Sequence, residues 1–282
     1  MRLSWVAACA VVAVAVGGAG QAIASGTGAS GSALGPVRMW GGTEIRSLDP
    51  PSAAAAASPP PPGSGSAQVQ RDEVLSNEQT FTRWAGIAHT GLIYGGPATA
   101  SAHVGRLHRY TEDGFPEVYL LLRSHRGTNG QEWVRLRIPA RPNGQTGWVR
   151  RQDLGTLHLT HTLIIVNRAR LRMYLYTNGR RVWSAPVAVG KPSTPTPSGH
   201  FWIRERFKIE DPRSGYWPYA FGTSDYSTLS EWPRGGVIGI HGPYYQAQSI
   251  PGRISHGCIR LRTSDDAWLA RHIGLGTPVQ VI

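Results

Sequence analysis

The sequence predicts a mainly β protein with one short C-terminal helix, in which a small β-barrel precedes a larger β domain. Gly and Pro are abundant, at 35 and 21 of 282 residues, which favours many turns and few long helices. From about residue 81 onward, short apolar runs alternate with turn residues, as in a chain of β-strands. Only one segment, near the C-terminus, has the capping residues and apolar spacing of a helix.

The first 24 residues predict a secretory signal peptide. Residues 1–2 supply a positive start, residues 3–16 are almost entirely apolar, and residues 22–24 form a small-x-small cleavage site. The apolar run is shorter than the roughly 20 residues that a membrane-spanning helix needs, although an uncleaved anchor remains the alternative. We therefore expect a secreted protein of the cell envelope, in the periplasm or cell wall, with membrane attachment only if the segment is uncleaved.

Residues 25–80 predict a disordered linker. This stretch is rich in Gly, Ala, Ser and Pro and has too little apolar bulk to offset the entropy lost on ordering. Its proline run should be semi-extended, so the segment suits a tether through a wall or envelope. A short apolar island at residues 37–40 is the exception, and the sequence gives no reason for it.

Residues 81–156 predict a small β domain of short strands between Gly-, Pro- and Asn-containing turns. The segments 132–136 and 146–149 resemble the last strands of bacterial SH3-like domains, which implies a wall-binding or spacer module. The alternative is a structural extension of the domain that follows.

Residues 157–282 predict a second β domain. Residues 163–166 have the apolar character of a buried strand, and Asn178-Gly179 between two apolar segments is a strong hairpin signal. A rigid Thr-Pro-rich turn at residues 194–199 comes next. Residues 204–231 show no clear periodicity, and we interpret them as a lid or a loop that faces the substrate.

The C-terminal end of this domain predicts the single helix and a last strand. Thr263 or Ser264 can cap the helix, with two aspartates in its first turn and Gly274 as its stop signal. Residues 277–282 then alternate as a strand.

The strongest chemical signal is Cys258 within residues 255–261. Apart from Cys9 in the predicted signal it is the only cysteine, so the mature chain offers it no partner for a disulfide. Oxidising compartments favour paired cysteines, so an unpaired one predicts a nucleophile. The thiolate is the attacking form, and a nearby imidazole, from His241 or His256, can take its proton.

The neighbours of Cys258 fit acyl chemistry. Gly257 allows a tight turn, backbone amides around it could hold an oxyanion, and Arg260 could bind a substrate carboxylate. Alternatives remain open at this point: an inert buried cysteine, satisfied structural histidines, or a zinc site of His241, His256 and Cys258. No fourth residue able to bind zinc lies at a spacing typical of zinc-binding motifs.

The formal net charge of +12 comes almost wholly from arginine, since Lys191 and Lys208 are the only lysines. Such a charge favours binding to an anionic partner. The alternative is that the arginines simply cover the surface of the protein. Export from the cell makes nucleic acid the weaker choice and anionic wall polymers the better one.

The two histidine motifs together resemble a known family. His241-Gly242 followed by residues 255–260, Ser-His-Gly-Cys-Ile-Arg, is similar to the signature of L,D-transpeptidases with a YkuD-type catalytic domain. The upstream hairpin and the turn at residues 196–201 also match that family's layout. The resemblance covers about residues 160–282 and implies a β-sandwich-like catalytic domain.

The resemblance implies peptidoglycan cross-linking by a cysteine acyltransferase. Cys258 would attack the carbonyl at the L-centre of the diamino acid in a tetrapeptide stem, release D-Ala, and pass the acyl group to an acceptor amine. His241 would be the general acid/base, oriented by the carbonyl of Gly242, and His256 would assist at the acyl site. The resemblance further implies that no metal or cofactor is needed and that carbapenems acylate the same thiol.

The remaining residues implied by the resemblance shape the substrate site. These residues are Gly242, Ser255, Gly257, Arg260, Tyr216 and Trp217. Three rival functions stay open: L,D-carboxypeptidase activity if water replaces the amine, a papain-like wall hydrolase, and a non-catalytic wall-binding protein. The hydrolase fits less well, because those enzymes place cysteine before histidine in the chain, and here both histidines come first.

Overall fold

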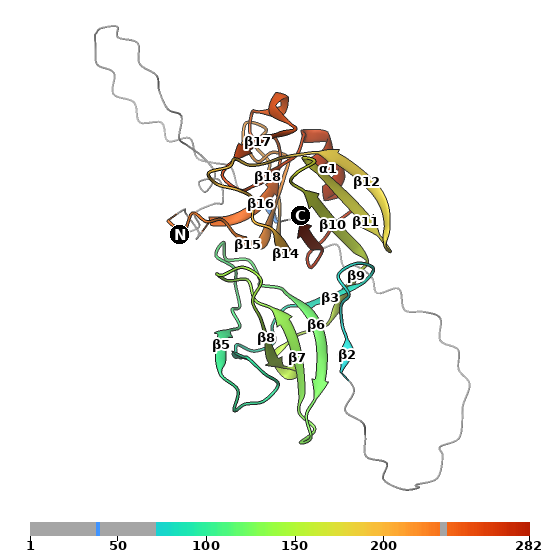
Figure 1. Ribbon diagram of the computed structural model, residues 1–282, viewed down its shortest axis with the longest axis vertical. Helices are drawn as coiled ribbons and strands as arrows, with labels where there is room; N and C mark the ends of the chain where they lie inside the picture. Colours follow the sequence, from blue (N-terminus) through green and yellow to red (C-terminus); the bar gives the residue numbers. More distant parts are fainter. Residues whose placement is uncertain (1–37, 40–71, 232–235) are drawn as a thin grey trace, which may run out of the picture.

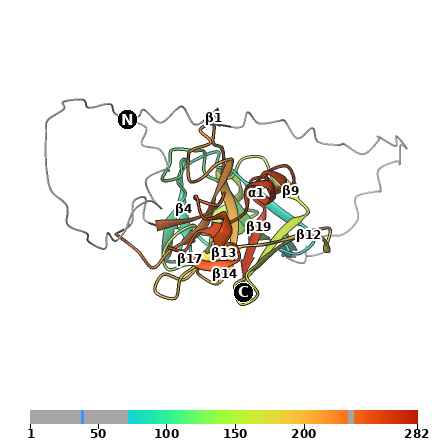
Figure 2. The same cartoon turned by 90° about the horizontal axis from the view of Figure 1, so that it is seen from above.

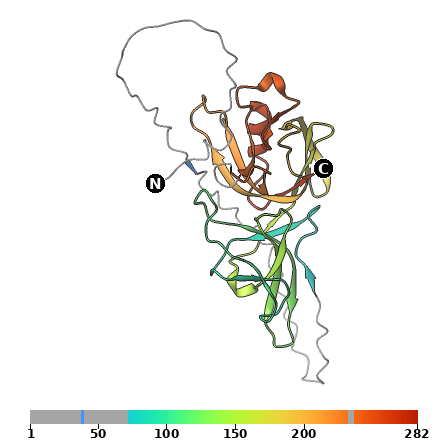
Figure 3. The same ribbon diagram turned by 60° about the vertical axis from the view of Figure 1, so that its left-hand side comes forward.

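The computed structural model describes residues 38–39, 72–231 and 236–282. Two β-sheets lie one above the other in Figure 1, one formed by the first part of the chain in green and the other by the C-terminal part in yellow to red. The turned view in Figure 3 shows the same two bodies in contact along the long axis. The predicted signal peptide lies outside the described residues. Among them, no helix is long and apolar enough to cross a membrane.

The first sheet has eight strands in the order β5-β4-β8-β7-β6-β3-β9, with β2 paired to β6. Its core consists of side chains such as Tyr119, Leu121 and Leu136, all fully buried. The first part of the described chain thus forms a sheet with its own core, while the small SH3-like barrel stays a prediction. The strands are β2 (Glu73–Val74), β3 (Thr82–Ala85), β4 (Leu92–Tyr94), β5 (His103–Arg106), β6 (Tyr119–Arg126), β7 (Glu132–Arg137), β8 (Thr146–Arg150) and β9 (His158–Thr160), with a short 3-10 helix at Arg151–Asp153.

Two predicted boundaries differ from the structure. The linker was expected to reach residue 80, but β2 pairs with β6 and β1 (Arg38–Met39) pairs with β14 of the second sheet. The first domain was expected to end at residue 156, but β9 pairs with β3 and so belongs to the first sheet. Strands of two or three residues are too short to show a period, which is why composition alone assigned these segments to linker or to the next domain.

The second sheet has eleven strands in the order β12-β11-β10-β19-β14-β15-β16-β18-β13-β17, with β1 paired to β14. Apolar side chains from most of these strands and from the helix form one core. The strands are β10 (Thr162–Asn167), β11 (Arg172–Thr177), β12 (Arg180–Pro186), β13 (Ala188–Gly190), β14 (Gly199–Lys208), β15 (Tyr219–Tyr226), β16 (Val237–His241), β17 (Gly252–Ser255), β18 (Ile259–Arg260) and β19 (Pro278–Val281), with a 3-10 helix at Ala247–Ser249. The predicted mainly β fold with one short helix is confirmed.

The hairpin predicted at Asn178-Gly179 is confirmed. Strands β11 and β12 pair antiparallel, and Thr177 lies opposite Arg180. Both turn residues have positive φ, 51° for Asn178 and 74° for Gly179, as a type I′ turn requires.

The interpretation of residues 204–231 as one long lid loop is wrong. Strand β14 continues to Lys208, and β15 occupies residues 219–226 between β14 and β16 near the middle of the sheet. Seven of the eight residues of β15 are buried. A strand covered on both faces has no alternation of polar and apolar residues, so its period was not visible. Residues 209–218, with Tyr216 and Trp217, do form a connecting loop.

The one α-helix among the described residues, α1 (Thr263–Ala270), lies against the second sheet, beside β19 in the view from above (Figure 2). Leu269 and Ala270 enter the core. The predicted cap differs by one residue, because Arg262 is the N-cap and no side chain caps the helix. Buried Asp266 instead accepts the backbone N–H of Tyr219 at 2.9 Å, which ties the helix to the start of β15.

Candidate active site

Cys258 lies in a tight turn between β17 and β18, and Ser255 closes that turn. The Ser255 hydroxyl donates to the carbonyl oxygen of Cys258 at 2.5 Å and accepts the backbone N–H of Gly257 at 3.1 Å. Ser255 is fully buried, so both bonds lie away from water. Ser255 thus shapes the turn, and the Gly257 amide that was a candidate oxyanion donor is already engaged.

Gly257 is required by the conformation of this turn. Its φ is +127°, and a Cβ atom there would lie 2.5 Å from Cδ1 of Ile238. An L-residue would meet both backbone strain and a collision with a buried side chain. The glycine therefore sets the path of the backbone just before the thiol.

The predicted rigid turn at residues 194–199 forms hydrogen bonds to the backbone of the cysteine turn. The Thr196 hydroxyl donates to the carbonyl of Gly257 at 2.6 Å and accepts the N–H of Gly190 at 2.9 Å. The Thr194 hydroxyl and the backbone N–H of Lys191 donate to the carbonyl of Ser255 at 3.2 and 3.0 Å. Sequence reasoning found this segment but not its contact with the site.

His241 ends β16 and is fully buried. Its Nδ1 lies 2.8 Å from the carbonyl oxygen of Gly242, the contact that the resemblance implies. A carbonyl only accepts, so Nδ1 carries the hydrogen. Nε2 is buried and has no hydrogen-bond partner in the described part of the chain. The ring is thereby held in the tautomer that leaves Nε2 able to accept a proton.

Strand pairing brings the cysteine turn next to the strand that carries this imidazole. Strands β16 and β18 are parallel, with His241 opposite Arg260. Cys258 comes directly before β18, so its turn begins beside β16. Cys258 also belongs to an apolar cluster with Tyr216, and the Tyr216 ring lies 4.7 Å from the His241 ring, centroid to centroid.

Cys258 is only 3% exposed. The apolar cluster around it includes Phe207, Tyr216 and Tyr226, with Trp217 and Tyr244 packed against it. In this conformation Cys258 is therefore shielded from solvent, with these aromatic side chains in the same cluster.

His256, the second predicted histidine, lies close to Lys191, a basic residue that the sequence did not mark as part of the site. Its Nε2 lies 3.5 Å from Nζ of Lys191. An ammonium only donates, so this contact is a hydrogen bond only while Nε2 of His256 is unprotonated. The carbonyl of His256 accepts the Ser227 hydroxyl at 3.3 Å.

Arg260 is buried rather than presented to solvent. Its guanidinium bonds to the side chain of Gln246 and lies 4.9 Å from the centre of the Tyr244 ring. Nε of Arg260 has no partner among the residues described. The predicted contact with a substrate carboxylate would therefore have to be made inside the site.

The predicted aromatic residues Tyr216 and Trp217 do lie at the site. Tyr216 packs between His241 and Tyr244. The carbonyl oxygen of Trp217 approaches Gly242 so closely that a Cβ there would lie 1.8 Å away. Gly242 thus allows the aromatic loop to pack on the histidine strand.

Sequence reasoning missed several residues that form the surroundings of the site. The sequence contains a weak signal for two of them. Lys191 is a rare lysine that follows a glycine, and Tyr244 comes just after the His-Gly motif. The missed residues are Lys191, Thr196, Ser227, Tyr244 and Gln246. The described residues contain no group of three His, Cys, Asp or Glu side chains able to hold a metal ion.

Comparison with known proteins agrees with this geometry. Residues 161–281 match the family model of the YkuD L,D-transpeptidase catalytic domain. L,D-transpeptidase 1 of Mycobacterium tuberculosis is 30% identical over 112 residues, which are 37% of this chain and 44% of that protein. L,D-transpeptidase 2 of the same organism is 30% identical over 110 residues, which are 37% of this chain and 27% of that protein. The alignments thus span less than half the length of these relatives.

Among solved structures, the catalytic domain of the Enterococcus faecium L,D-transpeptidase acylated by ertapenem is 26% identical. The match has a TM-score of 0.35 and covers 44% of this chain and 99% of that domain. By the family model and these relatives, residues 161–281 are similar to the YkuD L,D-transpeptidase catalytic domain.

Proposed function

We propose that this protein is a peptidoglycan L,D-transpeptidase in which Cys258 is the nucleophile. The observation that carries the proposal is the pairing of β16 with β18, which sets His241 and the cysteine turn side by side. The fixed tautomer of His241, with a basic Nε2 left over, suits proton transfer to and from a thiol. The family match supports the reaction class.

In the first half-reaction, Nε2 of His241 takes the thiol proton and the sulfur attacks the carbonyl at the L-centre of the donor stem. A carbon–sulfur bond forms, and the carbon–nitrogen bond to the terminal D-Ala breaks. The imidazolium gives its proton to the leaving amine, so D-Ala departs and a thioester remains.

In the second half-reaction, an acceptor amine attacks the thioester carbonyl and loses a proton to Nε2 of His241. The carbon–sulfur bond breaks, and the sulfur leaves as the thiolate, which regains the proton. Water in place of the amine gives L,D-carboxypeptidase activity with the same residues, so the two activities differ only in the acceptor.

Binding requires the aromatic cover of Cys258 to open. Tyr216 and Trp217 lie on the loop of residues 209–218, between β14 and β15, and are the side chains that a stem peptide would displace. We place Arg260 as an interior contact for a substrate carboxylate, because its Nε is the donor left over once Gln246 and Tyr244 are engaged.

A carbapenem should acylate Cys258 as a stem mimic, since a related catalytic domain is described as acylated by ertapenem. We further propose export to the cell envelope, from the N-terminal sequence, and attraction of the basic chain to anionic wall polymers.

Incubation of the purified protein with disaccharide-tetrapeptide stems tests the proposal. Mass spectrometry should find a cross-linked dimer and free D-Ala with the wild type and neither product with Cys258→Ser. A tripeptide product without dimer would identify the hydrolytic alternative. Unchanged stems with the wild type would reject both activities and favour a non-catalytic wall-binding protein.

A further inference from the structure

The first domain holds the end of β15, a segment that contacts the cysteine turn. Nδ2 of Asn143 donates to the carbonyl of Tyr226 at 3.0 Å, and Oδ1 of the same side chain accepts the N–H of Tyr226 at 3.0 Å. One amide side chain thus supplies both hydrogen bonds that a neighbouring strand would supply. Beside it, Nη2 of Arg141 donates to the carbonyl of Ser227 at 2.5 Å, and the guanidinium lies 4.9 Å from the Tyr226 ring centre.

The segment held in this way touches the site directly. The Ser227 hydroxyl donates to the carbonyl of His256, two residues before the nucleophile. The Tyr226 ring belongs to the same apolar cluster as Cys258. A shift of Tyr226 and Ser227 would therefore move both the cover of the sulfur and the backbone of its turn.

Within the second sheet this segment follows an irregularity. The pairing of β15 with β16 shifts register between Gly222 and Tyr226 and resumes where Tyr226 lies opposite Val237, and the N–H of Ser227 donates to the carbonyl of Gly236 at 2.7 Å. The side chains of Asn143 and Arg141 add their hydrogen bonds just after this shift.

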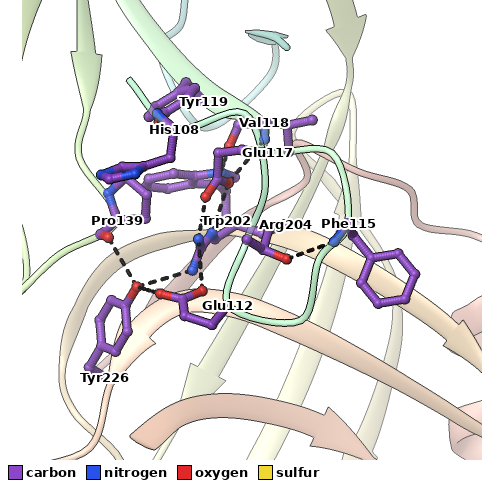
Figure 4. A network of polar contacts seen from close by, with 11 residues as sticks. His108, Glu112, Phe115, Glu117, Val118, Tyr119, Pro139, Trp202, Arg204 and Tyr226 are labelled. Carbon is purple, nitrogen blue, oxygen red and sulfur yellow. Dashed lines mark hydrogen bonds and ion pairs between the residues drawn. The ribbon is translucent and has the colours of Figure 1, made fainter. Parts of the chain in front are cut away.

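A buried polar network fixes the two domains against each other at the same place (Figure 4). Arg204 of β14 pairs with Glu117 of the first domain, and both side chains are at least 97% buried. Trp202 donates its Nε1–H to the carbonyl of Val118 at 2.8 Å. The Tyr226 hydroxyl lies 3.0 Å from the carbonyl of Pro139 and 3.2 Å from Nη1 of Arg204. Because these contacts set the position of the first domain, Asn143 and Arg141 meet the segment at a defined distance.

We propose that Asn143 and Arg141 are positioning residues for the cysteine turn, so that the first domain tunes the reactivity of Cys258. They hold Tyr226 and Ser227, and the Ser227 hydroxyl transmits that position to the backbone at His256. This inference rests on the proposed role of Cys258 as an acylated nucleophile.

The test is the rate of acylation by ertapenem, followed by intact mass in a series of variants of the whole protein. Asn143→Ala removes both bonds to Tyr226, and Ser227→Ala removes the link to His256. Asn129→Ala is the matched control, because Asn129 caps an exposed turn of the same domain, where it accepts the N–H of Gln131. Asn143→Asp keeps the acceptor for Tyr226 N–H and loses only the donor. Thermal unfolding of each variant is measured alongside.

We expect Asn143→Ala to lower the limiting first-order acylation rate about 10-fold, with little change in the ertapenem concentration for half-maximal rate. Asn129→Ala should match the wild type, and Asn143→Asp should fall between them. The double variant Asn143→Ala/Ser227→Ala should be about as slow as the slower single variant, because both changes break one chain of contacts.

Two results overturn the inference alone: Asn143→Ala acylated as fast as Asn129→Ala, or effects of Asn143 and Ser227 that multiply. If Asn143→Ala fails to fold, Asn143→Asp decides, and a wild-type rate in it counts against the inference. Failure of the wild type itself to be acylated at Cys258 would overturn the proposed function, and this inference with it.

Discussion

Nδ1 of His241 donates a hydrogen bond to the carbonyl oxygen of the next residue, Gly242, at 2.8 Å. This short-range contact does what a buried carboxylate does in many catalytic triads, since it fixes the ring and its tautomer. Unlike a carboxylate, the carbonyl of Gly242 adds no negative charge beside the thiol. The basic nitrogen, Nε2, is thereby turned away from the backbone and left for proton transfer.

Replacing the base tests this relationship. His241→Ala should lower the rate of acylation of Cys258 about 10²- to 10⁴-fold, because the proton acceptor is lost. His272→Ala is the control, since the Nδ1 of His272 also lies near a backbone carbonyl, that of Trp268 at 2.7 Å, on an exposed residue of the same domain. Stopped-flow mixing with a carbapenem measures both. Equal rates for the two variants would remove His241 from the mechanism.

Because Trp217 packs closely on Gly242, adding one methyl group at residue 242 should strongly affect both stability and acylation. Gly242→Ala would place a Cβ 1.8 Å from the carbonyl oxygen of Trp217, so the loop and the histidine strand must separate. We expect a loss of about 1–3 kcal/mol in the free energy of unfolding, together with slower acylation. Gly274→Ala, where a Cβ meets nothing within 4 Å, is the control in a urea titration. A Gly242→Ala variant as stable as the control would contradict the geometry.

The sequence predicted the parts of the molecule whose signals are local. The Asn178-Gly179 turn, the apolar runs of β10 and β19, and the C-terminal helix all depend on neighbouring residues, and the structure contains each of them. The motif residues Cys258 and His241 were visible because their types and spacing match a known signature.

Contacts between distant segments were not predictable. Strand β15 is buried on both faces and gave no period, so it was misread as part of a lid. Strand β13 pairs with β17 and β18, more than 60 residues further along the chain. This pairing brings Thr196 into contact with the backbone of the cysteine turn. Asn143 and Arg141 stand more than 80 residues from the segment that they hold. Their role depends on how two domains meet, which no local pattern encodes.

The ion pair between Arg204 and Glu117 predicts a large stability effect at the domain junction. Glu117→Gln would leave the guanidinium of Arg204 in a buried site with part of its charge unmatched, and we expect a loss of about 3–5 kcal/mol in the free energy of unfolding. Burial lowers the pKa of Arg204, but Glu117 together with Tyr226 and Glu112 more than offsets this and raises the pKa. The control is Glu210→Gln, which breaks the exposed pair with Lys208 and should change stability by less than about 1 kcal/mol. Similar chemical-denaturation midpoints for the two variants would refute the prediction.

Glu205 predicts a dependence of stability on pH. Burial, and then the nearby charge of Asp113, raise the pKa of this carboxyl from 4.5 to about 8. Between these two values the folded state holds a proton that the unfolded state has released. Stability contributed by Glu205 is therefore complete below about pH 4.5 and is lost as the pH rises toward 8.

Glu205→Gln should flatten this decline, because an amide does not titrate. Buried Asp225, whose pKa burial raises to about 7, adds a similar decline and remains in the variant. Urea titrations at pH 5 and pH 8 give the two free energies. Equal losses of stability in the wild type and in Glu205→Gln between these pH values would contradict this role of Glu205.

Whether the sulfur of Cys258 becomes acylated is decided by intact-mass analysis of the protein after incubation with a tetrapeptide stem. We expect a transient mass increase equal to the stem without D-Ala, located by peptide mapping on Cys258 and absent from Cys258→Ser. Cross-linked product formed by the Cys258→Ser variant, or an adduct on any other residue, would contradict it.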